Sequence, residues 1–194
     1  MYDVFRKYIN EVTSSIIPDD EFKHYEEAFA KKTMKKKQFF LHEGSVCKYA
    51  AFIVKGAMRL YSIDEKGHEH IVRFGIESWW MTDRESFQML TPSRYNIDAV
   101  EDCELLVTTS EAVARLKDRS PLFLKLMQIL DQNSYIASQH RIESTISYTA
   151  EEKFMQLMNT YPAFLHRFPQ NMIASYLGLT PETLSRIRKQ VLLK

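Results

Sequence analysis

The chain has 194 residues, of which 45% are hydrophobic and 26% are charged, and its formal net charge is +1. Such a chain is long enough to bury a core without disulfide bonds, and this composition excludes an intrinsically disordered protein. No stretch reaches the roughly 18 consecutive apolar residues of a membrane-spanning helix, and the N-terminal end lacks the apolar run of a signal peptide. We therefore expect a globular, cytoplasmic protein that has no membrane contact.

Two short helices and then a series of short strands are predicted for the first part of the chain. Residues 3–15 and 19–31 have helical patterns, and Asp19 is a suitable N-cap residue for the second helix. Short apolar runs follow at 38–41, 49–54, 57–63, 70–74 and 97–108. The loop before the fourth run ends in Gly67, which can supply the positive φ of a hairpin turn. This pattern predicts an antiparallel β sandwich or a small barrel.

A long helix is predicted after the strands. A short helix covers 110–117, and Pro121 suits the first position of the helix that follows it. The apolar side chains of this second helix form a stripe wide enough to contact both the β domain and the same helix of a second copy. The residues expected at the dimer interface are Leu122, Leu126, Ile129, Asn133 and Ile136. Asn133 either sets the register of the two helices or faces solvent.

Basic residues are concentrated toward the C-terminal end. Residues 148–194 contain six Lys and Arg against three acidic residues, whereas the first 147 residues contain 20 basic and 22 acidic residues. A basic tail on a slightly acidic body indicates a polyanionic partner or, alternatively, a solvated basic helix end.

Two short helices joined by a glycine are predicted near the C-terminus. Ala174 lets the two helices approach closely, Gly178 suits the left-handed turn between them, and Leu184 can lock the second helix onto the first. Thr180 is a good N-cap residue, and Pro181 suits the first helical position. This spacing predicts a helix-turn-helix, which places its second helix in the major groove of DNA.

The second helix of the motif carries the predicted DNA-binding side chains. Arg186 can form a bidentate pair with guanine, and Glu182 can accept from the amino group of cytosine. Ser185 suits a phosphate or a thymine methyl group, and Arg188 and Lys189 suit phosphates. Basic residues at the end of a helix also interact favourably with its dipole, which is the alternative role of the last two. The full predicted set is Thr180, Glu182, Thr183, Ser185, Arg186, Arg188 and Lys189.

The chain resembles the Crp/Fnr family of bacterial transcription regulators. The likeness lies in the order of the segments and in the motif Ile-Ala-Ser-Tyr-Leu-Gly-Leu-Thr-Pro-Glu-Thr-Leu-Ser-Arg at 173–186. It implies an α+β chain with a cyclic-nucleotide-binding-like jelly roll at 1–119, a dimerisation helix at 120–147 and a DNA-binding domain at 148–194. It also implies a homodimer on a near-palindromic operator of double-stranded DNA, with RNA polymerase as a further candidate partner.

The resemblance also bears on how the operator is read. Glu182 and Arg186 match the base-reading Glu and Arg of the family, whereas Pro181 stands where the family often has an Arg. We therefore expect an operator that is not read in the family's usual way at every base. Few residues follow this helix, so the wing of the family's winged helix is expected to be short or missing.

The effector site of the sensor domain departs from the family pattern. Members that bind cyclic AMP carry a Gly-Glu pair followed by an Arg-Ser/Thr-Ala run. In this chain Thr82 and Asp83 stand near the place of the pair, and Arg94 is followed by Tyr95 and Asn96. We therefore expect that cyclic AMP is not the effector. Thr82, Asp83 and Arg94 are candidates for binding another small anion, with a surface ion pair or a loop anchor as the alternative.

No cofactor, no metal and no enzymatic activity are predicted. Cys47 and Cys103 are too few for a disulfide framework or a four-thiolate cluster. His68 and His70 lack a third metal ligand nearby, and no nucleophile or phosphate-binding motif is found. The sequence therefore predicts a sequence-specific DNA-binding regulator whose effector, if there is one, is an unknown small molecule. The alternative is a small-ligand-binding or protein-interaction module whose helix-turn-helix no longer reads DNA.

Overall fold

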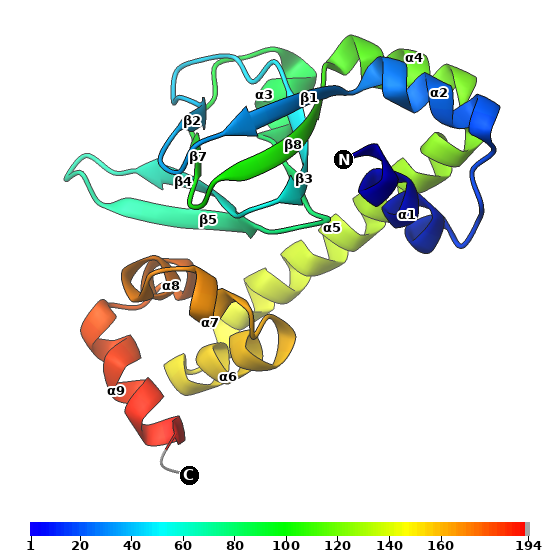
Figure 1. The fold of residues 1–194 in the computed structure, drawn as a ribbon. Coiled ribbons are helices and arrows are strands. Elements are labelled where there is room, and N and C mark those ends of the chain that lie inside the picture. Colours follow the sequence, from blue (N-terminus) through cyan, green and yellow to red (C-terminus); the bar gives the residue numbers. More distant parts are fainter. Residues whose placement is uncertain (193–194) are drawn as a thin grey trace.

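The computed structural model describes residues 1–192. It has an N-terminal β domain, a long helix and a C-terminal helical domain (Figure 1). The chain is an α+β protein, as predicted. The expectation of a short or missing wing concerns the chain after the last helix, where residues 193–194 lie outside the described part. Within residues 1–192, no helix combines the length and the apolar character needed to cross a membrane.

The β domain consists of two four-stranded antiparallel sheets. Its strands are β1 (Ala30–Met34), β2 (Phe39–Leu41), β3 (Ala50–Lys55), β4 (Met58–Ile63), β5 (Glu69–Gly75), β6 (Trp80–Met81), β7 (Asn96–Ala99) and β8 (Cys103–Thr108). The strand order is β1-β8-β3-β6 in one sheet and β2-β7-β4-β5 in the other. Between the sheets, Ile53, Met58 and Leu105 are fully buried. Gly56 permits the tight β3–β4 connection, because its φ is 98° and a side chain would press on the Asp102 carbonyl oxygen. The predicted antiparallel sandwich is confirmed.

Helices cover the outer face of the first sheet. They are α1 (Tyr2–Thr13), α2 (Asp19–Ala28), α4 (Ser110–Arg119) and the start of the long helix α5 (Pro121–Ser147). Phe5 lies among them, with its ring centroid 4.7 Å from that of Phe29 and 4.8 Å from that of Phe52. Phe123 and Leu126 are fully buried in the same cluster. The first turns of α5 therefore belong to the core of the β domain.

Some local expectations were wrong. Helix α2 ends at Ala28, and its N-cap position is Pro18, so that Asp19 lies in the first turn. Residues 30–34 form strand β1, which went unpredicted because its first four residues are exposed and show no apolar alternation. Two short helices were also not predicted, namely α3 (Arg84–Met89) and α7 (Phe164–Arg167). Elements of four to six residues are too short for a periodic signal.

The C-terminal domain rests on the outer face of the second sheet. It comprises α6 (Ala150–Thr160), α7, α8 (Gln170–Leu177) and α9 (Pro181–Leu192). Thr149 and Glu152 form a capping box at the start of α6. Phe74 of β5 stacks on Phe168, with ring centroids 3.9 Å apart, so the core of this domain is continuous with the sheet. In Figure 1 the domain lies beneath β5, at the far end of α5.

Candidate nucleic-acid interface

Helices α8 and α9 form a helix-turn-helix with the predicted contacts. Ala174 and Leu184 are 0% and 1% exposed, and they lie in one cluster with Ile173 and Ile187. Gly178 ends α8 with φ of 69°, the left-handed conformation that glycine adopts without strain. The next amide, Leu179 N–H, donates to the Ala174 carbonyl over 2.8 Å. The small residue, the glycine and the leucine therefore fix the angle between the two helices.

Thr180 starts the second helix. Its hydroxyl oxygen accepts a hydrogen bond from Thr183 N–H over 3.2 Å and donates to the Thr183 hydroxyl over 3.1 Å. The Gln170 side chain also donates to the Pro181 carbonyl over 3.4 Å. Two of the predicted DNA-binding residues, Thr180 and Thr183, thus have hydroxyl groups that already serve the helix end.

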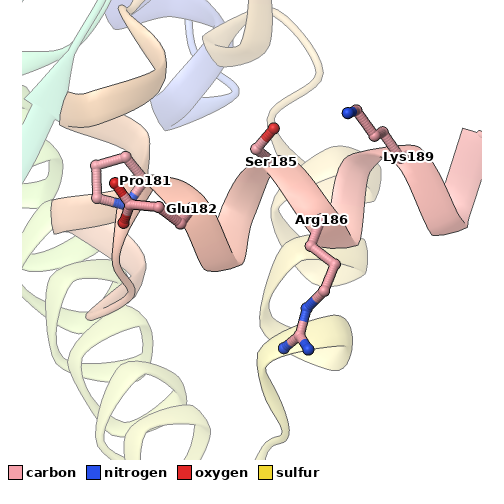
Figure 2. A pocket seen from close by; sticks show the side chains of 5 residues that line it. All are labelled: Pro181, Glu182, Ser185, Arg186 and Lys189. Carbon is pink, nitrogen blue, oxygen red and sulfur yellow. The ribbon is translucent and has the colours of Figure 1, made fainter.

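Four of the predicted residues share one face of α9. Glu182, Ser185, Arg186 and Lys189 line a shallow, open hollow together with Pro181. Their spacing of three and four residues places them along one broad face of the helix. In Figure 2, Arg186 extends from one edge of this face, and Ser185 and Lys189 extend from the other. Within residues 1–192, no carboxylate pairs with Arg186 or Lys189. This face therefore presents two unpaired cations and one carboxylate to solvent.

Arg188 lies apart from this face. It is half-buried, whereas Arg186 and Lys189 are exposed. It does not line the hollow. A helical rotation of about 100° per residue instead places it on the flank of α9, next to the buried side. The structure therefore separates Arg188 from the other charged residues of the predicted set.

The residues predicted for a dimer interface fall into two groups. Leu126 is fully buried within its own chain, and Leu122 packs beside it against the same cluster. Ile129 is half-buried, while Asn133 and Ile136 are exposed. Further along α5 the exposed large apolar side chains are Tyr135, Ile142 and Ile146. The surface of α5 that is free for a second copy thus lies in its C-terminal two thirds.

The predicted effector residues lie around helix α3. Asp83 is 6% exposed, and its carboxylate accepts from Ser93 Oγ over 2.7 Å and from the amides of Glu85 and Ser86 over 3.2 and 3.4 Å. The Thr82 hydroxyl donates to the Tyr49 carbonyl over 3.4 Å.

Arg94 lies outside that group of hydrogen bonds. Its side chain is 71% exposed, and its guanidinium lies 3.5 Å from the Glu85 carboxylate. The structure therefore joins Asp83 to its own loop and places Arg94 on the surface. Asp83 thus has the role of a loop anchor, and Arg94 takes part in a surface ion pair.

The histidines and cysteines have local partners. His68 and His70 both contact the Asp64 carboxylate, over 3.2 and 3.0 Å, and the hydrogen bond from His70 lowers the pKa of Asp64 well below its ordinary value. Among residues 1–192, His, Cys, Asp and Glu side chains form no group of three suited to a metal ion. Burial raises the pKa of the Cys103 thiol to about 11, which keeps it protonated and unreactive.

Sequence reasoning missed three polar residues that join the two domains. Arg167 of α7 forms ion pairs with Glu77 and Glu101 of the β domain. Arg141 of α5 and Ser175 of α8 hydrogen-bond to the backbone of β5. The main-chain partners of Arg141 and Ser175 leave no signal in the sequence, and the carboxylates that pair with Arg167 lie 66 and 90 residues away from it along the chain. The local pattern therefore offered no means of finding these three residues.

The comparisons with known proteins agree with this architecture. Residues 31–120 match the family described as "Cyclic nucleotide-binding domain". FixK2 of Bradyrhizobium japonicum superposes with a TM-score of 0.72 at 16% identity, covering 85% of each chain. The catabolite activator protein of Thermus thermophilus gives a TM-score of 0.56 at 17% identity, covering 93% of this chain and 86% of its own.

A third solved structure has a description that names the Crp/Fnr family. It is described as a transcriptional regulator of the Crp/Fnr family from Eubacterium rectale, and it gives a TM-score of 0.64 at 13% identity, covering 91% of this chain and 84% of its own. No curated protein matches the chain significantly by sequence. Residues 31–120 therefore match the cyclic nucleotide-binding domain family, and the chain shares its fold with solved structures that include one described as a member of the Crp/Fnr family.

Proposed function

We propose that this protein is a sequence-specific DNA-binding transcription regulator of the Crp/Fnr type that acts as a homodimer in the cytoplasm. The observation that carries the proposal is the open face of α9, where Glu182, Ser185, Arg186 and Lys189 meet solvent. The fold shared with FixK2, with a catabolite activator protein and with the structure described as a Crp/Fnr-family regulator supports the same function.

The side chains on this face suit a major groove. Arg186 can donate two hydrogen bonds to the O6 and N7 atoms of guanine, and Glu182 can accept one from cytosine N4. Lys189 and Ser185 can bind phosphates on either side of the groove. Because Arg188 is half-buried on the flank, we assign it a contact with a phosphate beside the groove rather than with a base.

A second copy of the chain would bind the second half-site of the operator. One recognition helix covers about one half-site, and a dimer binds two half-sites about one helical turn apart. The exposed side chains Ile136 and Ile142 on α5 support an interface between the two long helices. The DNA partner would then be a near-palindrome, and RNA polymerase would be a further partner of the bound dimer.

The sensor domain is proposed to respond to something other than cyclic AMP. The Asp83 carboxylate already holds the Ser93 hydroxyl and two amides, so a nucleotide would have to displace contacts that the loop itself makes. We expect cyclic AMP added in excess to leave the melting temperature of the full chain unchanged, whereas a ligand that binds only the folded state raises it.

The proposal is tested by selecting duplexes from a random DNA pool with the full chain. The selected sequence should be a near-palindrome, and its binding should weaken steeply as salt rises. Arg186→Ala should lower the affinity about 5- to 150-fold, which corresponds to about 1–3 kcal/mol, and should relax selectivity at one base of each half-site.

Arg115→Ala is the matched control, because Arg115 is also an exposed arginine on a helix but lies on α4. It should leave DNA binding unchanged. If the parent selects no sequence and binds without a salt dependence, the chain is instead an interaction module whose helix-turn-helix does not read DNA.

A further inference from the structure

Strand β5 lies at the end of its sheet, where it pairs only with β4. An edge strand leaves a row of main-chain N–H and C=O groups without a strand partner. In this chain helices α8 and α5 cover that row. The edge of β5 is therefore the place where the β domain, the long helix and the helix-turn-helix meet.

Ser175 of α8 takes the place of a neighbouring strand. Its hydroxyl oxygen accepts a hydrogen bond from Ile71 N–H over 2.9 Å. The same hydroxyl donates to the Glu69 carbonyl oxygen over 2.8 Å. One side chain of the first helix of the helix-turn-helix thus satisfies two adjacent main-chain groups of β5.

Arg141 of α5 binds the next part of the same edge. Its guanidinium donates to the carbonyl oxygens of Val72 and Ile71, the latter over 3.2 Å, and reaches the Tyr176 carbonyl oxygen over 3.5 Å. It also lies over the Tyr176 ring, 4.5 Å from the centroid. A single planar group therefore ties α5, β5 and α8 together. The fork of donors that makes this possible is particular to arginine.

The end of β5 that Ser175 contacts also forms an ion pair with the neighbouring strand of the sheet. The Glu69 carboxylate accepts from Arg59 on β4, which is 8% exposed. Arg59 also donates to both carboxylate oxygens of Asp98 on β7, over 2.8 and 2.9 Å. Strand β7 follows directly after the loop in which Ser93 binds Asp83. A series of polar contacts thus runs from Asp98 of β7 through Arg59 and Glu69 to Ser175 of α8, and β7 joins it along the chain to the α3 loop.

We propose that Ser175 and Arg141 are positioning residues for DNA recognition, which set the placement of α9 by clamping α8 to the edge of β5. The proposal rests on the DNA-binding function proposed above. It gives the sheet a connection to the helix-turn-helix through α8, in addition to the covalent connection through α5. Neither residue lies on the open face of α9, so their effect on DNA is indirect.

The clamp makes a specific prediction for operators with two half-sites. A dimer holds its recognition helices at one separation, so it should discriminate against operators whose half-sites are moved together or apart by one base pair. Loosening the clamp should weaken this discrimination. Binding to a single half-site should be unaffected, because the helix-turn-helix itself remains folded.

The experiment uses the full chain and the variants Ser175→Ala and Arg141→Lys. Ser138→Ala and Arg115→Lys are the controls, since the Ser138 hydroxyl bonds only within α5, to the Ser134 carbonyl, and Arg115 is exposed on α4. Hydrogen exchange at the Ile71 amide is measured first, without DNA. Ser175→Ala should accelerate it about fivefold to tenfold, the effect of one lost hydrogen bond.

Binding is then measured on the selected operator, on operators with altered half-site spacing and on one half-site. Both clamp variants should reduce the preference for the original spacing by about tenfold, and both controls should retain it. Unchanged spacing preference in the clamp variants overturns the proposal, as does an equal loss on the single half-site, which would indicate a merely structural role. A parent that selects no DNA sequence overturns the proposed function itself.

Discussion

The charged side chains on the open face of helix α9 are exposed, whereas Asp83 beside helix α3 is buried and hydrogen-bonded. On α9, Arg186 and Lys189 extend into solvent without a carboxylate partner among residues 1–192. Around α3, Asp83 is buried and accepts three hydrogen bonds from its own loop. Unpaired charges on a rigid helix are suited to an external partner, whereas a satisfied buried carboxylate serves the fold. The contrast separates an open, charged face on α9, where we propose that DNA binds, from a closed loop around α3 whose polar groups are already paired.

The largest expected effect comes from the other open surface, on α5. Ile136→Glu combined with Ile142→Glu places two charges on exposed apolar positions of that helix. The chain should then sediment as a folded monomer, and its affinity for a two-half-site operator should fall about 100-fold because the linkage of two binding events is lost.

The control for this prediction is Phe39→Glu combined with Ile63→Glu. These side chains are 40% and 43% exposed, which matches the 43% exposure of Ile136. They lie on β2 and β4 rather than on α5. The control should remain a dimer. If the Ile136→Glu and Ile142→Glu variant remains a dimer, the interface lies on another surface.

A smaller effect is expected from breaking the hydrogen bonds that Asp83 makes around α3. Asp83→Ala removes the cap of α3, leaves two amides without their side-chain acceptor and takes from the Ser93 hydroxyl the nearer of its two acceptors. The free energy of unfolding measured in urea should fall by about 1–3 kcal/mol. Asp83→Asn keeps an acceptor oxygen and should lose less.

Arg186→Ala provides the comparison within the same assay. Its exposed side chain should change the free energy of unfolding by less than about 0.5 kcal/mol. If Asp83→Ala is as harmless as Arg186→Ala, then the hydrogen bonds of Asp83 do not hold the loop around α3, and its role as a loop anchor is wrong.

The smallest effect concerns the ion pairs between the domains. Burial alone would raise the pKa of Glu77, but the hydrogen bond from Arg167 and those from backbone amides outweigh it, so that the pKa lies below its ordinary 4.5. A carboxyl group whose pKa is lowered by folding stabilises the folded state above its unfolded pKa, and this contribution disappears as the pH falls through the lowered value.

Urea unfolding of the parent and of Glu77→Gln, compared at neutral and acid pH, measures this contribution. Because the pair is partly exposed, the difference should be at most about 1 kcal/mol at neutral pH and should vanish in acid. A difference that persists or grows as the pH falls would show that Glu77 acts through packing and not through its charge.

The sequence alone determined the elements whose signals are local. The helix-turn-helix follows from three side chains within eleven residues, Ala174, Gly178 and Leu184, because each acts on the turn beside it. The antiparallel strands follow from short apolar runs between turns. The open face of α9 follows from helical spacing, which places Glu182 and Arg186 on one side.

Only the tertiary structure decided which groups meet across the chain. Leu126 continues the same apolar stripe as Ile136, yet it is buried within its own chain because α1 and α2 pack over the start of α5. Ser175 and Arg141 bind main-chain atoms of β5, and every residue type carries those atoms. A sequence pattern records side chains and their spacing along one element, so it cannot record a hydrogen bond to the backbone of a distant strand.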